Sequence, residues 1–127
     1  MYKELIDRAI KAREHAYVPY SSFKVGAALL TKSGKIYEGA NIESASFSLT
    51  NCAERTAFFK AVYDGEREFE AIAIVGGKDD LVFCPPCGAC REVMNEFCKG
   101  DFKIILLEKG EEKVYTLDEI MPLRFNL

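Results

Sequence analysis

Two cysteine-bearing segments constrain the fold of this chain more than any other feature. The first holds Cys52, with Glu54 two residues later, and the second is the run Pro86-Cys87-Gly88-Ala89-Cys90, whose first cysteine comes 35 residues after Cys52. Three cysteine sulfurs can hold one zinc ion and leave its fourth position open, which is typical of a catalytic rather than a structural zinc. Glu54 stands where a carboxylate can carry protons. The fold must therefore bring the two segments together.

Both segments are predicted to begin a helix. One helix is expected from about residue 51 to 64, with Asn51 as its N-cap, and another from about 88 to 98. Zinc ligands must be thiolates, and the positive end of a helix dipole lowers the pKa of a cysteine. Cys87 and Cys90 are three residues apart, so the first helical turn brings both sulfurs to one side.

Cys84 leaves an alternative open. It forms a second Cys-x-x-Cys pair with Cys87, so four cysteines could make a closed structural zinc site. The Pro85-Pro86 break before the helix favours a site without Cys84. A thioredoxin-type redox pair is disfavoured because it leaves Cys52 and Glu54 without a role.

The remaining candidate ligands have simpler interpretations. Cys98 falls late in a predicted helix and is interpreted as a small core residue. His15 is the only histidine, and we interpret it as a structural or surface residue.

The charge of the expected metal site needs compensation. Three thiolates and one Zn²⁺ sum to a net negative charge, which weakens the metal as a Lewis acid. Arg55 could offset this charge by donating hydrogen bonds to a ligand sulfur, and Arg91 is a second candidate. The alternative for either arginine is a solvated surface position.

Length and composition favour a single domain over residues 1–127, and the two cysteine-bearing segments indicate that this domain is catalytic. The 127 residues are 49% hydrophobic, which is enough to bury a core without disulfides. A net charge of -3 with scattered Lys and Arg argues against a nucleic acid polymer as partner. The sequence shows no signal-peptide core and no membrane-length apolar stretch, and its five cysteines suit a reducing compartment. We therefore expect a cytoplasmic protein that does not enter a membrane.

Apolar patterns alternate between helices and strands along the chain. Besides the two helices above, a helix is expected over residues 2–15 and a helical turn over 117–121. Strands are expected over residues 24–31, 36–39, 70–75, 103–107 and 111–115, and the polar stretch 41–50 is expected to be a loop. This interleaving indicates an α/β layered domain built on one mixed sheet.

Four runs of residues resemble the homotetrameric, short-chain, zinc-dependent cytidine deaminases. The runs are Pro19-Tyr20-Ser21-Ser22-Phe23-Lys24-Val25-Gly26-Ala27-Ala28-Leu29, Asn41-Ile42-Glu43, Asn51-Cys52-Ala53-Glu54-Arg55-Thr56-Ala57 and Pro86-Cys87-Gly88-Ala89-Cys90-Arg91. A Glu followed by Pro-Cys-x-x-Cys is the pattern of zinc nucleobase deaminases. The resemblance covers nearly the whole chain, and the combination is far more specific than a lone Cys-x-x-Cys.

The resemblance implies a fold, an activity and an assembly. The fold would be a three-layer α/β/α arrangement with one mixed five-stranded sheet. The activity would be hydrolytic deamination of cytidine and 2′-deoxycytidine to the uridine forms with release of ammonia, a step of pyrimidine salvage. One Zn²⁺ per chain would be held by Cys52, Cys87 and Cys90, with Glu54 as the proton shuttle. A homotetramer would form, in which a neighbouring subunit completes each pocket.

The resemblance also implies residues that bind the nucleoside. Phe23 would lie against the pyrimidine, and the backbone of Ala53 would help to hold the base. Asn41 and Glu43 would hydrogen-bond the ribose 3′-hydroxyl, with loop capping as the alternative role. Two further aromatic residues, Phe47 and Phe125, would stand near the site.

Two departures from the family pattern are visible. Cys84 stands where the family usually has Ser or Thr, and the tail over residues 121–127 is shorter and more irregular than usual.

Three other functions remain as alternatives. Deamination of another cytosine nucleoside, such as an antibiotic of the blasticidin type, is disfavoured by the ribose-binding pair Asn41 and Glu43. A polynucleotide-editing deaminase needs a basic groove, which the composition does not support. A zinc-stabilised binding module without activity does not explain Glu54 beside an open zinc position.

Overall fold

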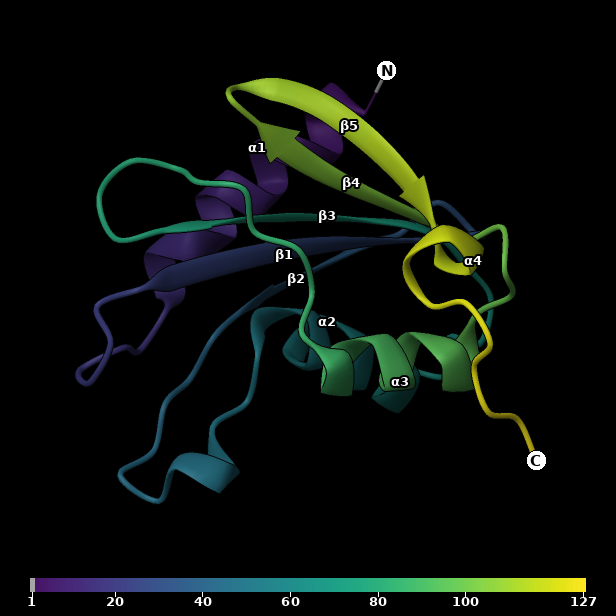
Figure 1. Ribbon diagram of the computed structural model, residues 1–127, viewed down its shortest axis with the longest axis horizontal. Coiled ribbons are helices and arrows are strands. Elements are labelled where there is room, and N and C mark those ends of the chain that lie inside the picture. The colour runs from purple at the N-terminus through teal and green to yellow at the C-terminus, as the bar shows by residue number, and fades with distance from the viewer. Residues whose placement is uncertain (1) are drawn as a thin grey trace.

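The computed structural model describes residues 2–127, and its centre is one five-stranded mixed sheet (Figure 1). The strands are β1 (Lys24–Thr31), β2 (Ile36–Ala40), β3 (Phe69–Gly77), β4 (Lys103–Glu108) and β5 (Glu111–Thr116), and their order is β2-β1-β3-β4-β5. Three neighbouring pairs are antiparallel, while β3 and β4 are parallel. A parallel pair needs a crossover connection, and the segment that contains helix α3 supplies it.

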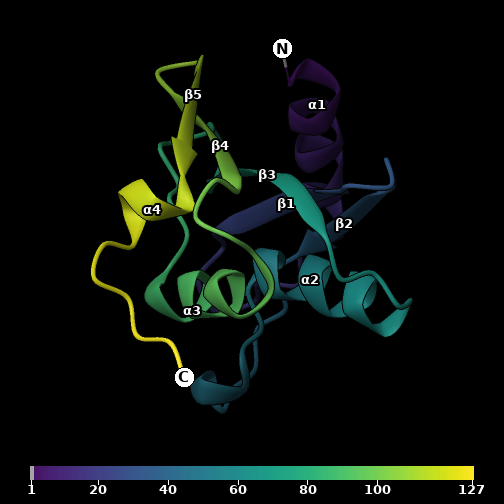
Figure 2. The same cartoon turned by 90° about the vertical axis from the view of Figure 1, so that its right-hand side faces the viewer.

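Helices cover both faces of the sheet, which confirms the three-layer α/β/α arrangement. Helix α1 (Lys3–Ala12), extended by the short 3-10 helix η1 (Arg13–His15), lies on one face. Helices α2 (Ala53–Tyr63) and α3 (Gly88–Phe97) lie side by side on the other (Figures 1 and 2). The remaining elements are the 3-10 helix η2 (Phe47–Leu49) and the short helix α4 (Leu117–Ile120). Within residues 2–127, none of the helices has the length and apolar character that crossing a membrane requires.

The sheet separates two apolar cores. The core under α1 is small and consists of Leu5, Ala9, Ala28, Ala71, Ala73, Val75 and Ile105. The core under α2 and α3 is larger and contains a cluster of four packed aromatic rings, Phe58, Phe69, Phe97 and Phe102. Burial of these side chains is the main favourable contribution to folding.

A glycine brings the start of α2 unusually close to the sheet. A Cβ atom at Gly39 in β2 would lie 2.3 Å from the carbonyl oxygen of Ala53 and 2.6 Å from the amide nitrogen of Ala57. Only a residue without a side chain lets the helix backbone approach a strand so closely. Gly39 therefore positions the first turn of α2, which carries Glu54, directly over the edge of the sheet.

The prediction that Asn51 caps the second helix is wrong, because Cys52 is the N-cap. The backbone of Asn51 is paired with Ile42 through two hydrogen bonds of 2.9 Å, which hold it in an extended bridge. Its side-chain amide donates instead to the hydroxyl of Thr56 at 3.2 Å. Tertiary pairing of the 41–50 loop thus delays the helix start by one residue.

Candidate active site

Three cysteine sulfurs converge where α2 and α3 begin. Cys52 is the N-cap of α2, Cys87 is the N-cap of α3, and Cys90 lies in the first turn of α3. Their sulfur atoms all lie within 4.8 Å of one another. Neither N-cap cysteine forms a side-chain capping hydrogen bond, so both sulfurs are available to a metal. The two segments that the sequence analysis singled out are therefore adjacent in space.

The spacing of the sulfurs fits zinc. Two sulfurs that each lie about 2.3 Å from a tetrahedral zinc are about 3.8 Å apart. The sulfurs of Cys52 and Cys87 are 3.8 Å apart. Among the side chains of residues 2–127, this is the one group of at least three His, Cys, Asp or Glu residues close enough to share an ion. Three thiolates leave a fourth position for a small ligand.

The other two cysteines lie outside this group. Cys84 is half-buried beside the site, and burial raises the pKa of its thiol to about 12. Burial likewise raises the pKa of Cys98 to about 12, and this residue packs against the larger core. The sulfurs of Cys84 and Cys98 do not belong to the group whose ligand atoms lie within 4.8 Å of one another, so the fold does not bring four cysteine sulfurs together.

Hydrogen bonds around the sulfurs favour a thiolate at Cys52. The hydrogen bond from Cys90 is the main cause that lowers the pKa of Cys52 to about 5, and a hydrogen bond from Arg55 adds to it. One terminal nitrogen of the Arg55 guanidinium lies 3.2 Å from the Cys52 sulfur. The Nε atom of Arg55 is buried without a protein hydrogen-bond partner. Arg55 thus stands where it can offset the charge of a thiolate.

Arg91, the second arginine candidate, has a different role. Its Nε atom donates to the carbonyl of Pro86 at 2.9 Å, and its Nη1 atom donates to the carbonyl of Ile120 at 2.7 Å. These bonds tie the loop before α3 to α4. Arg91 therefore braces the segment that carries Cys87 and contacts no sulfur through them.

Glu54 is a buried carboxyl group beside the sulfurs. It is the second residue of α2 and only 5% exposed. Burial raises the pKa of Glu54 to about 7, and the negative charge of Cys52 acts in the same direction. A carboxyl group with a pKa near neutrality can both accept and donate a proton. Glu54 is not one of the grouped metal-binding side chains.

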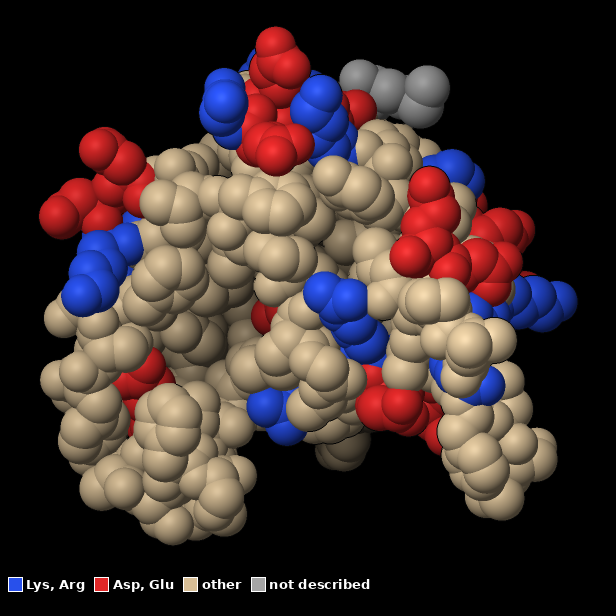
Figure 3. Space-filling model, in the orientation of Figure 1, with Lys and Arg blue, Asp and Glu red and all other residues tan. Residues whose placement is uncertain are grey.

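A cavity of about 270 Å³ opens beside these groups. Figure 3 shows the surface hollowed between the 41–50 loop and the segment leading into α3. The lining residues are Ser21, Phe23, Val25, Asn41, Glu43, Phe47, Thr50, Cys52, Ala53, Glu54, Cys84, Pro85 and Cys87. On the face shown in Figure 3, Lys and Arg are interspersed with Asp and Glu rather than gathered into one basic area.

Asn41 and Glu43 form hydrogen bonds with the wall of the cavity. Asn41 accepts a bond of 2.9 Å from the backbone of Val25 and donates one of 2.8 Å to the carbonyl of Phe23. Glu43 accepts bonds from the backbone amides of Tyr20 and Ser21 at 3.0 and 3.1 Å. These are the capping contacts that the sequence analysis left open. The ribose contact of the pair stays a prediction.

The two aromatic residues Phe47 and Phe125 occupy different places. Phe47 lines the cavity and is 69% exposed. Phe125 is 73% exposed and lies beside α3, where the Asn95 side chain donates to its carbonyl at 3.0 Å. The fold of one chain therefore does not bring Phe125 into the cavity with the cysteines.

Several lining residues were missed by the sequence analysis. Ser21 and Val25 lie within the same run of residues as Phe23, and the motif that indicated Phe23 could also have indicated them. Thr50 and Pro85 come from loops, and no pattern in the sequence indicates that these two loops face one another.

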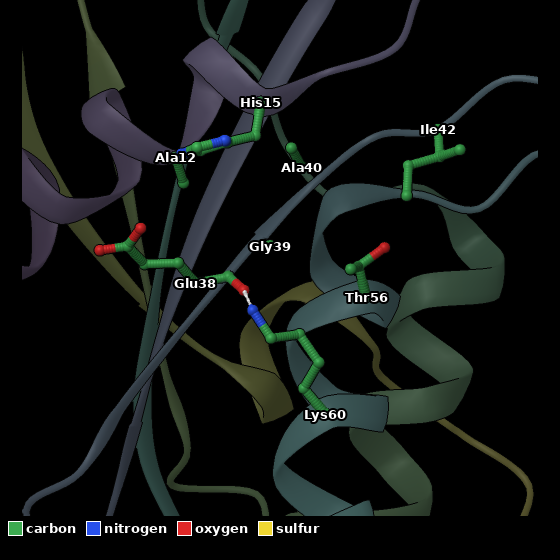
Figure 4. A pocket seen from close by; sticks show the side chains of 8 residues that line it. All are labelled: Ala12, His15, Glu38, Gly39, Ala40, Ile42, Thr56 and Lys60. Atoms are coloured by element: carbon green, nitrogen blue, oxygen red, sulfur yellow. Dashed lines mark hydrogen bonds between the residues drawn. The ribbon is translucent and has the colours of Figure 1, made fainter.

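A second cavity, of about 280 Å³, lies away from the cysteines (Figure 4). It is bordered by the end of α1, by η1, by β2 and by α2, and the ammonium group of Lys60 on one side donates to the carbonyl of Glu38 at 2.5 Å. His15 lines this cavity and is exposed, in agreement with its interpretation as a surface residue. None of the predicted site residues lines it.

Comparison with known proteins identifies the class that this fold and this site define. The family described as the cytidine and deoxycytidylate deaminase zinc-binding region matches residues 1–106, and the chain belongs to that family. The matched range contains Cys52, Cys87, Cys90 and Glu54. The three cysteines fit one zinc ion per chain.

Individual relatives place the chain among the short-chain, zinc-dependent members of the family. It is 52% identical over 125 residues to the cytidine deaminase of Sporosarcina psychrophila, covering 98% of this chain and 90% of the relative. It is 56% identical over 119 residues to the cytidine deaminase of Halalkalibacterium halodurans, covering 93% and 89%. The crystal structure of cytidine deaminase from Burkholderia pseudomallei matches with a TM-score of 0.91 at 47% identity and covers 98% and 99%. The high coverage on both sides means that the similarity concerns whole chains.

Proposed function

We propose that this protein deaminates cytidine and 2′-deoxycytidine hydrolytically, as a step of pyrimidine salvage. Water and the nucleoside would give uridine or 2′-deoxyuridine and ammonia. The observation that carries the proposal is the placement of Glu54, buried at the start of α2, beside three converging sulfurs and open to a cavity. Family membership and the named relatives support it.

The chemistry requires a nucleophile and a proton carrier. Zinc bound by Cys52, Cys87 and Cys90 would supply the first by lowering the pKa of water. Glu54 would accept the proton of that water and deliver it to N3 of the cytosine, which makes C4 electrophilic. After the C4–O bond forms, Glu54 would carry a proton to the amino group, and the C4–N bond would break to release ammonia. Arg55 would stabilise the Cys52 thiolate throughout.

The remaining lining residues would hold the nucleoside. Phe23 would lie against the pyrimidine ring, and the backbone of Ala53 would hold the base. Asn41 and Glu43 would hydrogen-bond the ribose 3′-hydroxyl, Glu43 as an acceptor, while keeping their bonds to the cavity wall. An oxygen of a carboxylate can accept more than one hydrogen bond, so both functions are compatible.

We also propose that four copies of the chain assemble and that neighbouring subunits complete each pocket. The support is the exposure of large apolar residues around and beyond the site. Phe47 and Phe125 are 69% and 73% exposed, and Tyr63 at the end of α2 is 91% exposed. Sedimentation equilibrium should give a mass four times that of the chain, whereas a monomer at assay concentration would contradict the assembly.

Five free cysteines suit a cytoplasmic location for such an enzyme.

One experiment tests the proposed function directly. Ammonia release from cytidine and 2′-deoxycytidine is measured together with the zinc content of the same sample. One zinc per chain with uridine formed supports the proposal. Zinc-loaded protein that turns over only a blasticidin-type nucleoside, only cytosine within single-stranded DNA, or no cytosine compound would overturn it in favour of the corresponding alternative.

A further inference from the structure

Gly76, near the end of β3, lies directly behind the wall of the cavity. It is buried and pairs with Val25 of β1 on one side. On the other side its carbonyl accepts a hydrogen bond of 2.8 Å from the backbone of Val82. It is not itself one of the lining residues.

A side chain at this position would collide with the cavity wall. A Cβ atom at Gly76 would lie 2.7 Å from the sulfur of Cys84, 3.0 Å from Cε1 of Phe23 and 3.2 Å from Cγ2 of Val25. Real Cβ contacts are longer than the first of these distances, so Cys84 would have to move. The three side chains that crowd position 76 all line the cavity that contains Glu54.

The requirement for glycine here is one of space and not of backbone conformation. The glycines of this chain with a positive φ are Gly34, Gly65, Gly77 and Gly110, and Gly76 is not among them. Alanine can therefore adopt the backbone of residue 76 without strain. The missing side chain matters only because Cys84 and Phe23 occupy its place.

Displaced side chains would move toward the cavity. Cys84 and Phe23 have Gly76 at their back and the cavity in front, and the paired strands β1 and β3 hold the backbone of Gly76 in place. A methyl group at position 76 would therefore make the cavity shallower from behind.

We infer that Gly76 is a positioning residue that sets the depth of the pyrimidine pocket by leaving room for Cys84 and Phe23. This inference rests on the proposed function, because it takes the cavity to be the site of the base. It also assigns a role to Cys84, whose sulfur forms part of the floor and does not bind the metal. The pair Gly76 and Cys84 is then a single packing unit, in which a larger residue at one position requires a smaller one at the other.

The test compares Gly76→Ala, Cys84→Ala and the double variant with the wild-type protein. Gly76→Ala should keep one zinc per chain and lower kcat/KM for cytidine by roughly fivefold to 100-fold, mainly through KM, as expected for overpacking. Cys84→Ala removes the sulfur that lies closest to the new methyl group, so the double variant should recover most of the loss. Ile74→Val, two residues earlier in the same strand and buried in the larger core, is the matched control and should lower Tm without changing KM.

The inference and the proposed function are tested by different measurements. The wild-type assay alone decides whether cytidine is a substrate. Crystal structures of zinc-loaded wild type and Gly76→Ala decide the packing without any activity: the sulfur of Cys84 should shift toward the cavity. An unmoved Cys84, an unchanged KM, or no recovery in the double variant overturns the inference. If Gly76→Ala does not fold, the double variant should fold, and its failure to do so would also overturn it.

Discussion

The two faces of the central sheet are built alike, but only one of them buries an ionisable group of the candidate active site. Each face is covered by helices that approach the strands closely, and on each a glycine permits the approach: Gly26 beneath α1 and Gly39 beneath α2. The α1 face buries only apolar side chains in its core. The opposite face also buries Glu54, at the point where the starts of α2 and α3 meet.

The difference shows what a buried ionisable group needs. An isolated carboxylate is costly to bury, so burial moves its pKa and favours the neutral form. Two helix N-termini with Arg55 nearby provide positive potential for the thiolates, and the cavity gives Glu54 access to a substrate. The cavity beside the end of α1 is lined by none of the three clustered cysteines and not by Glu54.

The largest expected effect comes from a metal ligand. Cys90→Ala should remove zinc and with it essentially all deaminase activity, since two thiolates cannot hold the ion in a three-ligand site. Cys84→Ala is the matched control, and it should retain one zinc per chain. Atomic absorption on purified protein measures both. Zinc lost from Cys84→Ala, or kept in Cys90→Ala, would mean that the ligand set is wrong.

The next effect compares two glutamates at equivalent helix positions. Glu54 and Glu4 are each the second residue of a helix, α2 and α1 respectively, but Glu4 is exposed. Glu54→Gln should keep the zinc and lower kcat by about 10² to 10⁴, the range for a general acid-base group. Glu4→Gln should leave kcat unchanged. Near-normal turnover by zinc-loaded Glu54→Gln would remove Glu54 from the mechanism.

A smaller effect compares two arginines. Arg55 donates to the Cys52 sulfur, whereas Arg13, at the end of α1, donates to the carbonyls of Lys24 at 3.0 Å and Gly77 at 2.6 Å. Arg55→Gln should weaken zinc affinity by about 10- to 100-fold, as for other groups that hydrogen-bond a metal ligand. Arg13→Gln should lower Tm and leave zinc affinity unchanged. Competition with a chromogenic chelator measures the affinities, and equal affinities for the two variants would contradict the assigned contact.

The smallest effect concerns pH. The hydrogen bond from the Ser21 hydroxyl is the main cause that lowers the pKa of Glu43 below its ordinary value. A carboxyl group with a lowered folded-state pKa stabilises the fold above its unfolded pKa and loses this contribution as the pH falls through the folded value. The Tm difference between wild type and Glu43→Gln should therefore be greatest near neutral pH and shrink below about pH 4. A difference that persists unchanged in acid would show that ionised Glu43 does not brace the cavity wall.

Much of this structure was predictable because it depends on local patterns. All five strands were predicted to within two residues at each end, and the start of α3 followed from the Pro85-Pro86 break before it. The N-cap at Asn51 was predicted wrongly because a non-local bridge to Ile42 holds that residue in an extended conformation. The positions of Phe125 and Gly76 depend on contacts with distant segments, which no local pattern records.

The sequence by itself determined which groups are available: the thiols of Cys52, Cys87 and Cys90 with a fourth at Cys84, one carboxyl group two residues after Cys52, and helix starts that favour thiolates. Only the tertiary structure decided which of these groups meet. Because β3 and β4 are parallel, the connection between them must run back over one face of the sheet, and this connection contains α3. On that face α3 lies beside α2, so that the sulfurs of residues 52 and 87 are 3.8 Å apart. The same packing leaves Cys84 in the cavity wall against Gly76 and outside the group of sulfurs. The physical reason is that distances between remote residues follow from how whole elements pack, whereas ligand chemistry is a property of each residue.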